Sequence, residues 1–82
     1  MSMKLWILQP VDGRDAPWLA YYDCMFGFVV RAANEDEARS IAASRAGDEG
    51  PDAWKLRRNS TCKELKAEGP AGVIMEDANR PK

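Results

Sequence analysis

Two segments in the first third of the chain carry the hydrophobic pattern of β-strands. Residues 4–11 are mostly apolar, are too few for a stable helix, and reach a proline at position 10. Residues 25–32 alternate along the chain, so that Phe26, Phe28 and Val30 fall on one side of a strand. A third apolar run, residues 71–76, follows a Gly-Pro break. We therefore expect three strands, with Phe26 and Phe28 in the core.

A helix is indicated between the second and third of these segments. Asn34 suits the N-cap position, and Glu37 stands where its side chain can reach back to unpaired backbone N–H groups. The acids at positions 35–37 suit the positive end of the helix dipole. The inward positions at helical spacing are mostly small: Ala38, Ile41, Ala42 and Arg45. We expect the helix to end at Gly47 and to pack closely on a sheet.

The connection from Gly47 to Pro70 is long for a compact domain and lacks a clear period. Pro51 suits the first position of a single helical turn, and Thr61 to Glu64 fit a second capping box. Its apolar side chains are expected to be largely buried: Trp54, Leu56, Cys62 and Leu65. The order strand, strand, helix, irregular segment, strand predicts a small α+β two-layer sandwich with a three-stranded sheet and one main helix. We expect one domain over residues 1–78 and a flexible tail at 79–82; the strand pairing stays open.

The composition of the 82-residue chain argues against catalysis. Its 12 basic and 13 acidic side chains give a formal charge of −1, which disfavours a strongly basic nucleic-acid binder. The absence of histidine removes the Ser-His-Asp and Cys-His catalytic pairs and the commonest metal ligand. We therefore predict neither an enzyme nor a bound metal or cofactor.

The cysteine count and the apolar runs indicate a compartment. Cys24 and Cys62 permit one disulfide, but a small secreted scaffold usually carries more cysteines, so we expect reduced thiols. The chain shows neither the pattern of a secretion signal nor an apolar run of about 20 residues that would span a membrane. The cytoplasm is the expected location.

Aromatic and acidic clusters supply the candidates for binding a partner. Five of the seven aromatic side chains fall between positions 18 and 28, and three of them lie in a loop: Trp18, Tyr21 and Tyr22. These three either fold back over a small core or provide an exposed anchor, because interfaces favour Trp and Tyr. Asp48, Glu49 and Asp52 lack the alternating oxygen ligands of a calcium loop. The three aromatic and three acidic residues are the predicted partner-binding set.

Charge is distributed unevenly along the chain, and this supports an alternative function. Five basic residues stand against nine acids before Lys55, and seven basic residues stand against four acids from Lys55 onward. The later segment could bind DNA or RNA through its cations: Lys55, Arg57, Arg58, Lys63 and Lys66. Ordinary solvated surface is the simpler explanation of the same charges.

Several stretches together resemble small phage and prophage proteins of unknown function. They cover most of the chain: Lys4–Asp12, Tyr21–Asp23, Phe26–Ala32, Ala46–Gly50, Ser60–Cys62 and Gly72–Met75. Small phage-encoded domains without catalytic groups include anti-CRISPR inhibitors. By analogy, the resemblance implies a monomeric viral inhibitor in the host cytoplasm that binds a CRISPR effector complex and blocks its nucleic-acid-binding surface.

Overall fold

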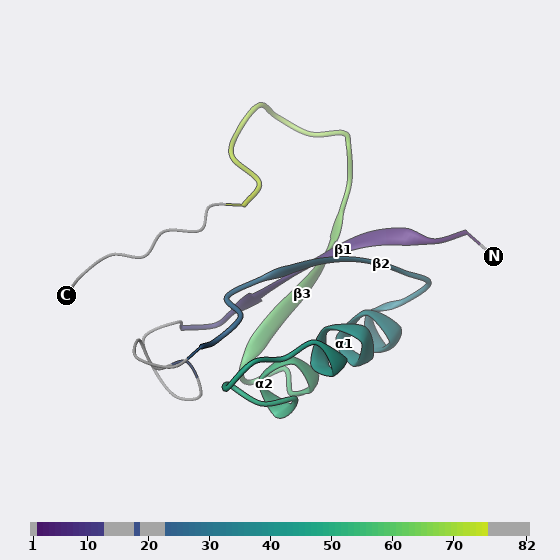
Figure 1. The fold of residues 1–82 in the computed structure, drawn as a ribbon. Helices are drawn as coiled ribbons and strands as arrows, with labels where there is room; N and C mark the ends of the chain where they lie inside the picture. The colour runs from purple at the N-terminus through teal and green to yellow at the C-terminus, as the bar shows by residue number, and fades with distance from the viewer. Residues whose placement is uncertain (1, 13–17, 19–22, 76–82) are drawn as a thin grey trace.

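A three-stranded antiparallel sheet forms one layer of the molecule. The computed structural model describes residues 2–12, 18 and 23–75. Strand β1 (Lys4–Pro10) lies at the centre, between β2 (Phe28–Ala32) and β3 (Ser60–Leu65), as Figure 1 shows. Register pairs Ile7 with Val29 on one side and with Lys63 on the other. The first strand along the chain, β1, is therefore the central strand of the sheet.

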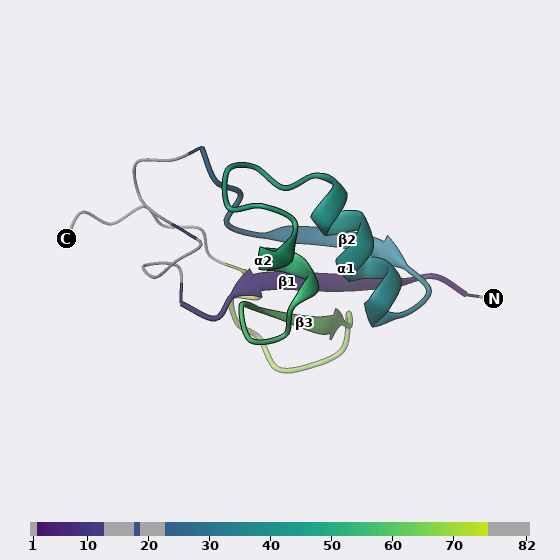
Figure 2. The ribbon, with the colours of Figure 1, turned by 90° about the horizontal axis from the view of Figure 1, so that it is seen from below.

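Two helices form the second layer and cover one face of the sheet. Helix α1 (Glu35–Ser44) and the single turn α2 (Asp52–Lys55) lie below the strands in Figure 1, and Figure 2 shows them across β1 and β2. Asn34 is the N-cap of α1, and its Oδ1 accepts a hydrogen bond from Glu37 N at 2.9 Å. The Glu37 carboxylate accepts one from Ala33 N at 2.7 Å. This reciprocal pairing satisfies N–H groups that a helix start leaves without intrahelical partners.

The core lies between the sheet and the helices. Leu8, Val30 and Ala32 project from the strands onto the alanines of α1, and Trp54 comes from α2. Because alanine side chains are short, the helix approaches the sheet closely. Trp54 fills the end of the layer, where its ring meets Trp18 and Phe28 edge-on at centroid distances of 5.2 and 4.9 Å.

The structure confirms three expectations: the α+β class, the helix start at Asn34 and the single turn that follows Pro51. The third strand lies elsewhere than expected, because residues 60–65 pair with β1 over six positions. Residues 71–75 form no strand. Pro70 lacks a backbone donor and Gly72 weakens strand formation, so only three apolar residues remain there for pairing.

Other expectations are corrected in detail. Strand β2 begins at Phe28, three residues later than expected, and Phe26 is exposed. Helix α1 ends at Ser44, before Gly47, and Ile41 is exposed while Arg39 is buried. The expected tail at residues 79–82 lies outside the described residues. No helix of the described part is long and apolar enough to cross a lipid bilayer.

Candidate functional site

The sheet face that points away from the helices forms an aliphatic surface. Side chains alternate along a strand, and Trp6, Leu8, Phe28 and Val30 pack toward the helices. The intervening positions therefore point the other way. We call this surface the aliphatic sheet face, and it consists of Leu5, Ile7, Val29, Leu65, Arg31 and Lys63.

Strand register arranges these six residues in two rows. One row runs Arg31, Leu5, Leu65 across the three strands, because Leu5 pairs with both of the others. The second row runs Val29, Ile7, Lys63. The two cations therefore lie on opposite edge strands, with aliphatic side chains between them.

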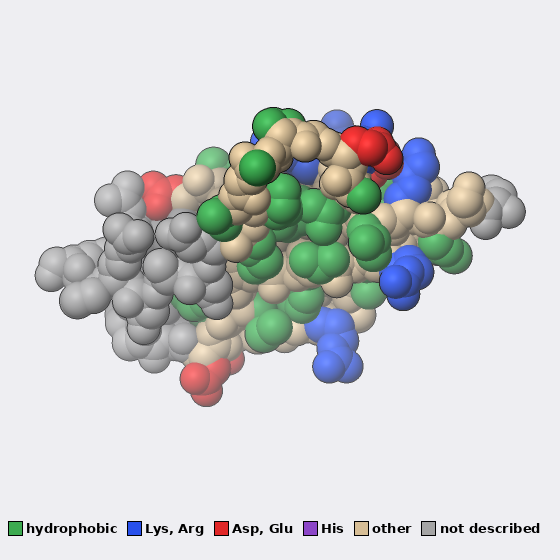
Figure 3. Space-filling model, turned by 90° about the horizontal axis from the view of Figure 1, so that it is seen from above, with side chains coloured by type: hydrophobic (Ala, Val, Ile, Leu, Met, Phe, Trp, Pro, Cys, Tyr) green, Lys and Arg blue, Asp and Glu red, His purple; other side chains and the backbone are tan. Residues whose placement is uncertain are grey.

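The aliphatic sheet face is only partly covered. Val29 is 52% exposed and Leu5 is 38% exposed, whereas Ile7 is 7% exposed. Figure 3 shows hydrophobic side chains gathered on this side of the molecule, beneath a loop that follows β3. A contiguous exposed apolar patch of this kind is typical of a surface that binds another molecule.

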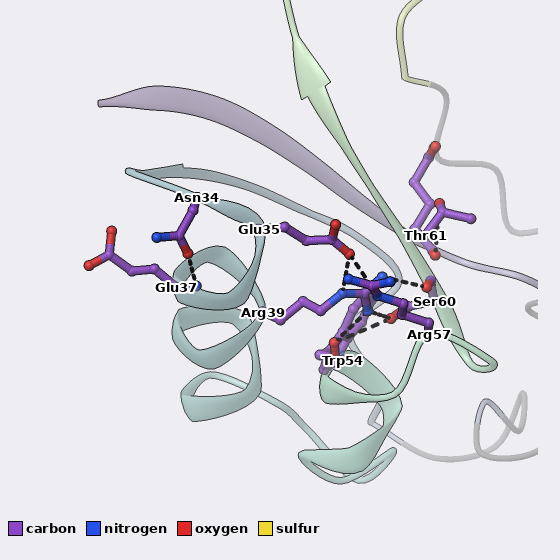
Figure 4. A network of polar contacts seen from close by, with 9 residues as sticks. Asn34, Glu35, Glu37, Arg39, Trp54, Arg57, Ser60 and Thr61 are labelled. Atoms are coloured by element: carbon purple, nitrogen blue, oxygen red, sulfur yellow. Dashed lines mark hydrogen bonds and ion pairs between the residues drawn. The ribbon is translucent and has the colours of Figure 1, made fainter. Parts of the chain in front are cut away.

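A polar cluster centred on Arg39 lies on the helix side, where it serves the fold. Arg39 of α1 is buried, and its Nη1 donates to Trp54 O at 2.9 Å and to Ser60 Oγ at 3.0 Å. Its Nη2 donates to Ser60 O at 3.0 Å and its Nε to Glu35 Oε2 at 2.9 Å (Figure 4). Each contact ties α1 to α2 or β3, or lies within α1. The guanidinium thus joins three elements of the fold.

Metal-ligand groups and thiols were the chemical features to locate among the described residues. They include no group of three or more carboxylate or thiol side chains that could hold a metal ion. Cys24 and Cys62 are both thiols. Burial raises the pKa of Cys62 above its ordinary 9.0, Arg39 opposes that shift, and Glu35 adds to it. A raised pKa keeps a thiol protonated at neutral pH, which disfavours a role as nucleophile.

Two members of the predicted partner-binding set are buried in the fold. Trp18 is 1% exposed, and its Nε1 donates to Met25 O at 2.7 Å. Glu49 is buried too, and its carboxylate accepts from Met25 N at 3.0 Å and from Trp54 Nε1 at 2.5 Å. This corrects the expectation that Glu49 faces a partner, and it places Trp18 in the first of its two predicted arrangements, folded back over the core. A small core uses the tryptophan, and the acid binds N–H groups that would otherwise be unpaired.

The other predicted acids remain at the surface. Asp48 is exposed, with Oδ2 accepting from Asp23 N at 3.2 Å, and Asp52 is exposed in the first turn of α2. Asp48 lies in the connection between α1 and α2, and Asp52 lies in α2, so neither comes from the strands that form the aliphatic sheet face. Tyr21 and Tyr22 lie outside the described residues.

The predicted nucleic-acid-binding cations do not share one surface. Lys55, Arg57 and Arg58 lie in or just after α2, and Arg57 Nε is 3.4 Å from Glu35 Oε2. Lys63 points to the other face of the sheet, and Lys66 follows β3. Their closeness in sequence therefore does not translate into one basic groove.

Sequence reasoning missed the aliphatic sheet face because it assigned the third strand to residues 71–76. The local signal in residues 60–65 is weak, because Thr61, Lys63 and Leu65 alternate with Ser60, Cys62 and Glu64 and neither set is consistently apolar. No protein-family model matches the chain, and no curated protein or solved structure shows significant similarity to it.

Proposed function

We propose that this chain is a non-catalytic protein-binding inhibitor that docks on its partner through the aliphatic sheet face. The observation that carries the proposal is the exposure of Val29 and Leu5 in adjacent rows of a well-paired sheet. Burying two such side chains against a partner removes apolar surface from water, which is the main favourable term in association.

The charges at the edges of this face define the chemistry of the partner. Arg31 and Lys63 are the charged side chains that the three described strands turn to this side, and both are cationic. They fit a protein segment with aliphatic side chains followed or flanked by acids, because complementary charges favour the correct register. The face carries no aromatic side chain from these strands, so it lacks the stacking platform typical of single-stranded nucleic-acid binding.

The resemblance to small phage proteins suggests which partner to test. In that form of the proposal, the partner is a CRISPR effector complex in the cytoplasm of the host. The aliphatic sheet face holds the effector, while Asp48 and Asp52 on the helix layer present negative charge along its nucleic-acid path. Like charges repel, so a bound nucleic acid would be disfavoured there.

The test uses purified, guide-loaded effector complexes of the multi-subunit and single-subunit types. Binding of the chain is measured by interferometry, and inhibition is measured as loss of target-DNA cleavage. We expect Val29→Lys to weaken binding by about tenfold or more, since a cation would then face a desolvated apolar contact. Ile41→Lys is the matched control, because Ile41 is an exposed aliphatic residue on α1.

A second pair of variants separates docking from blocking. Asp48→Lys with Asp52→Lys should leave effector binding intact and reduce the inhibition of cleavage. The proposal is overturned if no effector binds the chain, or if Ile41→Lys weakens binding as much as Val29→Lys. It is replaced by the nucleic-acid alternative if the chain shifts short DNA or RNA at low salt and Arg57→Ala with Arg58→Ala abolishes the shift.

A further inference from the structure

Strand β2 forms one outer edge of the sheet. It pairs with β1 on its inner side, and the strand order places no neighbour on its outer side (Figure 2). In an antiparallel ladder, alternate residues of an edge strand direct their N–H and C=O groups away from the sheet. Among the residues that the structure describes, the one hydrogen bond of β2 outside this ladder is accepted by Ala32 O from Trp6 Nε1, at 3.0 Å. The other outward groups of β2 are therefore available to another strand.

Strand β2 lacks the features that usually protect an edge strand from pairing. Natural edge strands carry lysine, proline or a bulge, or are covered by another segment. Residues 28–32 contain neither lysine nor proline, pair with β1 without a break in register, and are mostly Phe and Val, which favour strands. The opposite edge differs, because β3 carries the adjacent charges of Lys63 and Glu64. Strand β2 is therefore the edge better suited to receive another strand.

The two side chains that β2 turns to the aliphatic sheet face specify which strand fits. Val29 is 52% exposed, Arg31 is exposed, and the two lie two positions apart on that face. A strand added to β2 places one of its own side chains directly beside each of them. An aliphatic residue beside Val29 removes apolar surface from water, and an acid beside Arg31 supplies the opposite charge. The best-fitting segment therefore carries an acid and an aliphatic residue two positions apart.

We propose that β2 receives an extended segment of the partner, with this acid and this aliphatic residue, as a fourth and antiparallel strand. The inference rests on the proposed function, because it names how the partner engages the β2 edge of the same aliphatic sheet face. Antiparallel pairing continues the pattern of the sheet and is slightly more stable per residue than parallel pairing. In that direction the residue beside Arg31 precedes the residue beside Val29, so the acid comes first. Main-chain hydrogen bonds supply affinity, and the two side chains supply specificity.

Synthetic peptides test both the chemistry and the direction of the added strand. The probe is a blocked peptide of seven residues, all threonine except for glutamate at the third position and valine at the fifth; the reversed peptide exchanges these two. Each is titrated into the isotope-labelled, full-length chain and followed by NMR. We expect the probe to bind with a dissociation constant on the order of 1 mM and to shift the amide signals of residues 28–32 far more than those of residues 60–65. The reversed peptide should bind about threefold more weakly, and a probe with N-methylated amides should not bind.

Charge reversal at the two edges of the sheet provides matched variants. Arg31→Glu should weaken binding of the probe by about threefold or more, and should strengthen binding of a peptide with lysine in place of the glutamate by a similar factor. Lys63→Glu is the control, because Lys63 is an exposed cation of the same face on the opposite edge strand. Both variants change the net charge equally. A general electrostatic effect would therefore appear in both, whereas pairing at β2 responds to Arg31→Glu.

The outcomes separate this inference from the proposed function. Strand addition at β2 is overturned if the probe leaves the signals of residues 28–32 in place, if both peptide orders bind equally, or if Arg31→Glu and Lys63→Glu have equal effects. If Val29→Lys still weakens effector binding in that case, docking through the aliphatic sheet face stands in another geometry. If the probe binds β2 in the expected order while Val29→Lys leaves effector binding unchanged, the docking proposal fails and strand addition stands as a peptide-binding property of β2.

Discussion

The two faces of the sheet differ in how their side chains are covered. On the helix side, Trp54 and Leu8 are fully buried, and within the described residues no buried side-chain polar atom lacks a hydrogen-bond partner. On the other side, Val29 is half exposed and Leu5 is 38% exposed, with neither helix packed against them. The first face therefore carries the stability of a small domain. The second has apolar surface that the fold does not need, which leaves it available for binding.

The largest test of this difference is to remove a ring from the helix side. Trp54→Ala deletes edge-on contacts with Trp18 and Phe28 and leaves the Glu49 carboxylate without its indole donor. We expect a loss of about 3–5 kcal/mol in the free energy of unfolding. Val29→Ala on the opposite face should cost less than about 0.5 kcal/mol, as exposed substitutions do. Urea denaturation followed by circular dichroism measures both, and similar losses would contradict the comparison.

A sharper comparison uses neighbouring positions of β1, whose side chains point to opposite faces. Leu8→Ala should cost about 3–4 kcal/mol, because a packed helix layer relaxes little around the cavity. Ile7→Ala should cost about 1–2 kcal/mol, because its partly exposed neighbours Leu5 and Val29 can close around the space that is left, and the cost depends on how well a site collapses. Both free energies come from the same denaturation curves. An Ile7→Ala loss equal to that of Leu8→Ala would mean that the side of the sheet opposite the helices is packed as firmly as the helix side.

The sequence predicted the helix-covered face of the sheet more successfully than the aliphatic sheet face. Alternation in residues 25–32 and the capping pair of Asn34 and Glu37 are local signals, and both predicted their elements. The position of the third strand depends on contacts between segments far apart in the sequence. Residues 60–65 form it, rather than residues 71–76, because they pair in register with β1 over six positions. No local propensity encodes that match, so the face built from it was not predicted.

Burial of charged side chains was also beyond the sequence pattern. Arg39 and Glu49 look like solvent-exposed residues in the sequence, yet each satisfies backbone or ring N–H and C=O groups that the fold buries. Their roles depend on the positions of Met25, Trp54 and Ser60 in three dimensions. The aromatic cluster was read more accurately, since folding back over the core was one of its two predicted arrangements and Trp18 adopts it.

The next prediction concerns the polar part of the helix side. Arg39→Met keeps an unbranched apolar stem but removes the guanidinium, and so leaves Trp54 O and Ser60 O without this donor. We expect a loss of about 2–3 kcal/mol, the cost of leaving buried acceptors unpaired. Arg57→Met is the matched control, because Arg57 is a mostly exposed partner of the same Glu35 and should cost less than about 0.5 kcal/mol. Thermal unfolding of the wild type, Arg39→Met and Arg57→Met measures these losses. Equal stability of Arg39→Met and the wild type would contradict a structural role for Arg39.

The smallest expected effect concerns the Cys62 thiol, which packs against the helix-side core. Its pKa is raised in the folded chain, chiefly by burial, so above pH 9.0 the unfolded chain ionises this thiol first. The unfolded state therefore gains stability as pH rises past 9.0, and folding stability falls until the folded thiol also ionises. Cys62→Ala removes this dependence, so the stability difference between wild type and variant should shift toward the variant between pH 8 and pH 10. Iodoacetamide labelling gives an independent readout: at pH 8.5 Cys62 should react more slowly in the native chain than in urea, because alkylation requires the thiolate. Equal rates in the two states would place the thiol in contact with solvent and would weaken the contrast between a closed helix side and the more exposed aliphatic sheet face.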